Sequence, residues 1–96
     1  MPSMQKLSDY ATTVAGDGDA MRVTYHSAVI VEWTAETVTL RTGGWDTVTT
    51  RRKMNQASNQ FGLGYQVFRH DGDSFVRRPD GGEMPLDSVT TFKRKG

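Results

Sequence analysis

Residues 47–78 read TVTTRRKMNQASNQFGLGYQVFRHDGDSFVRR, and the spacing of their apolar residues changes partway along from helical to alternating. The first half carries small and apolar residues at i, i+4, i+7 and i+11, the spacing of one helical face: Thr50, Met54, Ala57 and Phe61. Gly62 follows them, and glycine ends helices readily because it adopts the left-handed conformation without steric cost. Asp46, Thr47 or Thr49 can cap the other end. The pattern predicts a helix over residues 47–61.

The second half of this stretch predicts a β-hairpin. Residues 65–70 and 74–78 are rich in aromatic and β-branched side chains, which favour strands. Between them lies Asp71-Gly72, a dipeptide suited to a two-residue hairpin turn because both positions tolerate a positive φ.

The flanking sequence predicts further short strands. Residues 21–25, 28–33 and 37–40 precede the helix, and a last strand is expected near 88–92. This order predicts an α+β fold: a small, mostly antiparallel sheet of about five to six short strands packed by a single central helix, in β-β-β-α-β-β order. The expected core comprises Val23, Val29, Val31, Val38, Leu40, Met54, Phe61, Val67 and Phe75.

The chain has 96 residues, which indicates one domain. Residues 1–20 are rich in Ser, Thr, Asp and Gly and end in a turn-forming run, so we expect a flexible N-terminal tail followed by an α+β domain over 21–96. Within the tail, Met4, Leu7, Ala11 and Val14 have the spacing of a short helical face, an alternative that would need a partner surface.

Composition excludes several classes of protein. The chain has no cysteine, which removes disulfide frameworks, thiolate metal sites and cysteine nucleophiles. Its longest apolar run, residues 28–31, is far too short to span a membrane, and residues 1–20 lack the apolar core of a secretory signal. We therefore expect a cytoplasmic protein without a membrane partner. The expected small core makes a homo-oligomer plausible.

Charge is uneven along the chain despite a net charge of +1. Residues 1–40 hold two basic and five acidic residues (net −3), whereas residues 41–96 hold ten basic and six acidic residues (net +4). The densest basic run, Arg51-Arg52-Lys53, falls in the first turn of the predicted helix, where the helix dipole disfavours cations. With Thr49 and Thr50 these residues form a candidate anion site for a phosphate group. The alternative is that the three cations are simply solvated.

The same helix carries amide side chains on its polar face. Arg52, Gln56 and Asn59 form one row, and Arg51, Asn55 and Ser58 form the neighbouring row. Arginine, asparagine and glutamine are the side chains that read purine edges, so Asn55, Gln56 and Asn59 join the candidate ligand-binding residues, although an ordinary solvent-facing helix could look the same. Trp45, just before the helix, completes the candidate site; its ring could stack on a base, pack on the core or enter a subunit contact.

The sequence offers no catalytic constellation. His26 and His70 both lie beside predicted turns, and the Asp-Gly-Asp triplets at 17–19 and 71–73 lack the further ligands of a calcium loop. No phosphate-cradling or dinucleotide-binding glycine motif is present. We therefore expect a protein that is not an enzyme, with no metal site and no cofactor.

Residues 43–56, GGWDTVTTRRKMNQ, resemble a segment of small proteins encoded by bacteriophages and prophages. The resemblance covers roughly residues 21–78 and rests most on the Thr-Thr-Arg-Arg and Asn-Gln positions; residues 1–20 and the final 18 residues have no counterpart in it. It implies a viral origin and the cytoplasm of an infected bacterium, without implying a mechanism.

Three functions follow from these observations. The first is a non-enzymatic binding protein that engages nucleic acid or another phosphate-bearing ligand through residues 49–53 and the polar helix face, with residues 93–95 adding positive charge. The second is a phage interaction or counter-defence protein that binds a host bacterial protein, with Trp45, Tyr65 and Phe68 as contact anchors. The third is a homo-oligomer that sequesters a small nucleotide.

Overall fold

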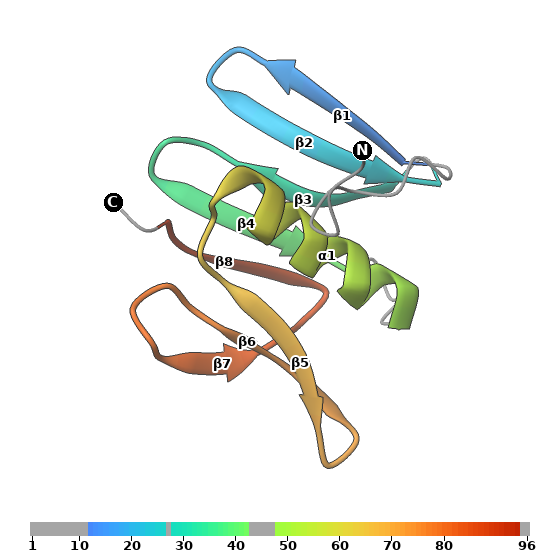
Figure 1. Ribbon diagram of the computed structural model, residues 1–96, viewed down its shortest axis with the longest axis vertical. Helices are drawn as coiled ribbons and strands as arrows, with labels where there is room; N and C mark the ends of the chain where they lie inside the picture. The colour runs from blue at the N-terminus through green and yellow to red at the C-terminus, as the bar shows by residue number, and fades with distance from the viewer. Residues whose placement is uncertain (1–11, 27, 43–47, 95–96) are drawn as a thin grey trace.

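The computed structural model describes residues 12–26, 28–42 and 48–94 of the chain (Figure 1). Its elements follow the order β1 (Thr12–Asp17), β2 (Ala20–Tyr25), β3 (Ala28–Trp33), β4 (Thr37–Arg41), α1 (Val48–Phe61), β5 (Gln66–His70), β6 (Asp73–Arg77), β7 (Glu83–Pro85) and β8 (Val89–Lys93). One helix and antiparallel strands make this an α+β fold, as predicted.

The strands form two sheets instead of the single sheet expected. One has the order β1-β2-β3-β4-β8 and the other the order β5-β6-β7, and every pairing is antiparallel. Helix α1 packs between them, with contacts to β3 on one side and β5 on the other (Figure 1). The prediction of about five to six strands in one sheet was wrong because β8 joins β4, across the helix in sequence, while the hairpin pairs with β7.

The predicted helix and hairpin are confirmed. Gly62 has a φ of 64°, and the Leu63 N–H donates to the Ser58 carbonyl over 3.0 Å, which closes the C-terminus of α1. In the hairpin, Asp71 and Gly72 have φ values of 52° and 85°, as a two-residue turn between β5 and β6 requires. Of the residues expected to cap the start of the helix, Asp46 and Thr47 lie outside the described part of the chain.

The expected tail contains a strand. Residues 12–17 form β1 and pair along their whole length with β2, so that Val14 lies opposite Val23. The Asp-Gly-Asp run does turn the chain, with Gly18 at a φ of 63°, but it joins two strands instead of ending a tail. The short helix considered for this region would have included Val14, which lies in β1; Met4, Leu7 and Ala11 lie outside the described residues.

The core fills the space between the larger sheet, the helix and β5–β6. Six of the nine predicted core residues are buried: Val23, Val31, Val38, Leu40, Met54 and Val67. The other three, Val29, Phe61 and Phe75, are half-buried. Ile30 is buried in place of Val29. The pairing of β2 with β3 shifts in register after Val23↔Val31, and the bulge formed there turns the Ile30 side chain inward. Phe75 lies opposite Phe68, and its neighbour Val76 is the buried residue.

A candidate ligand-binding groove beside the helix

Two side chains of α1 bind the backbone of β5 in the way that a neighbouring strand would. Asn55 donates from Nδ2 to the Val67 carbonyl over 2.8 Å and accepts from the Val67 N–H at Oδ1 over 2.7 Å. Ser58 Oγ donates to the Tyr65 carbonyl over 2.6 Å and accepts from the Tyr65 N–H over 3.0 Å. Asn55 and Ser58 are three positions apart and therefore share one side of the helix, and Tyr65 and Val67 are two positions apart, so that their backbone groups point to the same edge of the strand.

This pairing divides the polar face of the helix into two rows with different roles. The row of Asn55 and Ser58 faces β5 and holds the helix against it. Only the two ends of the other predicted row face solvent: Arg52 and Asn59 are exposed, whereas Gln56 is half-buried and its Oε1 atom is buried without a hydrogen-bond partner. Asn55 therefore has its amide engaged in the fold, and Arg52 and Asn59 border the solvent on either side of Gln56.

The start of the helix presents less positive charge than the sequence suggested. Lys53 is only 4% exposed, and its Nζ lies 4.9 Å from the centre of the Tyr25 ring. Burial lowers the pKa of the Lys53 amine, because desolvation disfavours the ammonium form. Thr50 is also buried, whereas Thr49 and Arg52 are exposed and Arg51 is half-buried. Trp45 lies outside the described residues. A ligand at this end would meet Thr49 and the two arginines, without Thr50 or Lys53.

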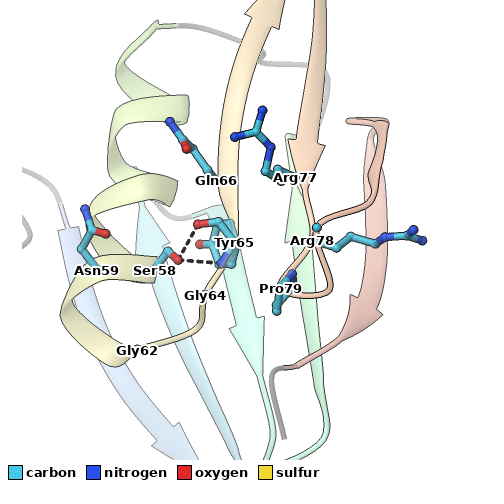
Figure 2. A pocket seen from close by; sticks show the side chains of 10 residues that line it. Ser58, Asn59, Gly62, Gly64, Tyr65, Gln66, Arg77, Arg78 and Pro79 are labelled. Atoms are coloured by element: carbon cyan, nitrogen blue, oxygen red, sulfur yellow. Dashed lines mark hydrogen bonds between the residues drawn. The ribbon is translucent and has the colours of Figure 1, made fainter.

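A groove of about 550 Å³ opens at the other end of the helix, where α1 turns into β5 (Figure 2). The segment that joins α1 to β5 contributes Gly62, Gly64 and Tyr65 to its lining. Figure 2 shows Asn59 on the helix side of this groove, with Gln66 and Arg77 adjacent on the opposite strands. The register pairs Gln66 with Arg77 across β5 and β6. The lining consists of Ser58, Asn59, Gly62, Gly64, Tyr65, Gln66, Arg77, Arg78, Pro79 and Gly81.

Among the described residues, the lining of the groove includes two arginines and two amide side chains and no carboxylate. Arg77 donates from Nε and Nη2 to Glu83 over 3.2 and 2.9 Å, which leaves its Nη1 outside these bonds. This ion pair is about half exposed and therefore contributes little to stability, so a phosphate can compete for Arg77.

Arg78 lies between this groove and a second one of about 510 Å³, which Lys93 and Arg94 also line. Its Nε is buried without a hydrogen-bond partner and lies 3.3 Å from an Asp80 oxygen. A Cβ atom added to Gly82 would come within 2.9 Å of Arg78 Cζ, so the glycine leaves room for the guanidinium. The described lining of the second groove therefore holds three basic side chains, Arg78, Lys93 and Arg94, together with the carboxylate of Asp80.

The hydroxyl groups at the groove are committed to the fold. Ser58 Oγ is saturated by the Tyr65 backbone, and Tyr65 donates from its hydroxyl to the Met54 carbonyl over 2.5 Å. Burial raises the pKa of Tyr65 far above its ordinary value, which removes it as a general acid or base near neutral pH. Within the described ranges, no three histidine or carboxylate side chains gather as metal ligands.

Comparison with known proteins places the chain in a viral family. The profile of the family described as Kyanoviridae Gp96 protein matches residues 2–94. The chain belongs to the Kyanoviridae Gp96 protein family. The match to this family of small phage-encoded proteins extends over nearly the whole chain. It includes most of residues 1–20 and of the final 18 residues, for which the resemblance over residues 21–78 had no counterpart. No curated protein and no solved structure matches the chain. Among the described residues of this Gp96-family chain, no helix has the length and apolar character to cross a membrane.

The sequence predicted the helix residue that lines the groove but not the groove residues that follow the helix. Asn59 was a candidate residue, and it lines the groove. Gln66, Arg77 and Arg78 were not proposed, although the Asp71-Gly72 turn fixes a register that places Gln66 opposite Arg77. Counting outward from that turn would have identified this polar pair, because a two-residue turn sets the pairing of both strands.

Proposed function

We propose that this phage protein is a non-enzymatic binding protein that engages nucleic acid, or another phosphate-bearing ligand, through the groove beside α1. One observation carries the proposal: the helix row of Arg52, Gln56 and Asn59 meets the groove at Asn59, which is exposed and lines it. Their union is a polar strip of Arg52, Gln56, Asn59, Gln66 and Arg77, which we call the groove strip. It contains two arginines, three amides and no carboxylate.

The composition of the groove strip suits a nucleic acid. Arginine binds phosphate oxygens through charged hydrogen bonds, and asparagine and glutamine both donate to and accept from base edges or sugars. Lys93 and Arg94 line the second groove beyond Arg78, where among the described residues they outnumber the one carboxylate, Asp80, and would contact the phosphates of a chain longer than one nucleotide. The groove strip replaces the start of the helix as the preferred site because Thr50 and Lys53 are buried there.

The test is fluorescence anisotropy of labelled single-stranded and duplex 20-mers at about 50 and 200 mM salt. We expect saturable binding that weakens steeply with salt, because each phosphate contact releases counterions. In the double variant Arg52→Gln, Arg77→Gln, we expect about tenfold weaker binding at the lower salt concentration and a salt slope smaller by about two.

The matched control is the double variant Arg22→Gln, Arg41→Gln, which removes the same charge from the larger sheet. These two arginines flank Glu32, at 3.2 and 3.5 Å. The proposal predicts that this control keeps the salt slope of the natural protein. Equal losses in both double variants would show that only overall charge matters, and absence of binding at about 50 mM salt would contradict the function and direct attention to host proteins.

A further inference from the structure

The outward face of the smaller sheet carries an aromatic pair beside the groove. Along β5 and β6, Val67 and Val76 point into the core, and the alternate residues point the other way. This second face presents Gln66 opposite Arg77 and, two positions along each strand, Phe68 opposite Phe75. Both phenylalanines are half-buried, although each is large and apolar. The polar pair that lines the groove therefore adjoins an aromatic pair on the same face.

These side chains form a continuous stack. The rings of Phe68 and Phe75 have centroids 5.8 Å apart with an angle of 24° between their planes. The guanidinium of Arg77 lies over Phe68, with Cζ 5.5 Å from the ring centre. Planar rings beside an arginine suit a nucleic-acid base, because every base has an aromatic face that stacks and the adjoining phosphate needs a cation.

We propose that the groove binds single-stranded nucleic acid, with bases stacking on the Phe68–Phe75 pair and the adjoining phosphates bound at Arg77. This inference rests on the proposed function and specifies its ligand. A duplex keeps its bases stacked on one another inside the helix, so they cannot reach the two rings, whereas a single strand can splay its bases onto them. The turn of the β5–β6 hairpin extends away from the larger sheet (Figure 1).

The test compares three labelled probes of equal length by anisotropy at low salt: oligodeoxythymidylate, a duplex, and an abasic strand with the same phosphates. We expect oligodeoxythymidylate to bind about tenfold more tightly than either of the other probes, because each stacked base strengthens binding. Oligouridylate in a further titration distinguishes DNA from RNA as the source of the strand; preference for either one supports the inference.

Three variants test whether the stacking takes place on the aromatic pair. Phe68→Leu removes the ring but keeps an apolar side chain, and we expect the tenfold preference for bases over the abasic strand to fall to about twofold or less. Phe68→Tyr retains a ring and should retain the preference. Phe75→Leu should match Phe68→Leu, and urea unfolding checks that all three variants are folded at the temperature of the titration.

The outcomes separate the inference from the proposed function. Equal affinity for the abasic strand and for oligodeoxythymidylate would overturn stacking while leaving phosphate binding in place. Equal or tighter binding of the duplex would overturn the single-strand preference in the same way. Failure of every probe to bind would overturn both proposals and leave the aromatic face as a surface for a host protein.

Discussion

Replacing Asn55 with leucine is expected to lower the free energy of unfolding by about 2–4 kcal/mol, because it leaves the N–H and the carbonyl of Val67 without hydrogen-bond partners. Val67 is 3% exposed, so water cannot readily replace the lost hydrogen bonds. The helix would also lose one of the two side chains that attach it to β5. Urea denaturation followed by circular dichroism measures the change.

The control is Asn59→Leu, the same substitution one turn along the helix. Asn59 is exposed, so we expect a change within about 0.5 kcal/mol. If the two variants unfold at the same urea concentration, Asn55 does not connect the helix to the smaller sheet in the way that these distances imply.

Raising the pH above 10 is expected to destabilise the protein through Tyr65. Burial raises the pKa of this phenol above its ordinary value of 10.0, so between these two values the unfolded chain releases a proton that the folded chain keeps. The stabilisation is fully present below pH 10 and declines above it, by about 1.4 kcal/mol for each pH unit. At about pH 11.5 the loss would therefore reach about 2 kcal/mol.

Tyr65→Phe isolates this effect, because phenylalanine has no proton to release. At neutral pH the variant should be about 1 kcal/mol less stable, since it lacks the hydrogen bond to the Met54 carbonyl. Lys53 titrates with a lowered pKa in both proteins, so its contribution cancels in the comparison. Urea midpoints measured from pH 7 to about 11.5 should cross near pH 11; parallel curves would contradict the burial of the phenol.

The sequence specified those elements of the fold whose causes are local. The period of Thr50, Met54, Ala57 and Phe61 predicted the buried face of the helix; the first three residues are buried and Phe61 is half-buried. The Asp71-Gly72 turn predicted the hairpin because its two residues supply the positive φ values that such a turn needs. Both predictions depended on residues close together in the chain.

The missed features depend on contacts between distant segments. Strand β1 consists of weakly apolar residues and becomes a strand by pairing with β2, and β7 is a three-residue strand ending in Pro85 at a sheet edge, where proline is tolerated. The bulge that buries Ile30 instead of Val29 arises from the register between β2 and β3, which the local sequence pattern does not predict.

The candidate site was predicted in part for the same reason. Helical spacing correctly grouped Arg52 with Gln56 and Asn59, but it could not show that the neighbouring row binds β5. Lys53 appeared basic and exposed in the sequence, whereas the Tyr25 ring of β2 covers its amine. The arginines of the groove come from β6 and the turn after it, which the tertiary fold brings beside the helix end.

The most direct test of nucleic-acid binding at the groove is a two-dimensional NMR titration of the ¹⁵N-labelled protein with oligodeoxythymidylate. We expect progressive shifts of the backbone amides of Asn59, Gln66, Phe68 and Arg77, with the amides of β1 and β2 unchanged. Shifts confined to the larger sheet, or no shift at a protein concentration that saturates the anisotropy signal, would contradict the groove as the binding site.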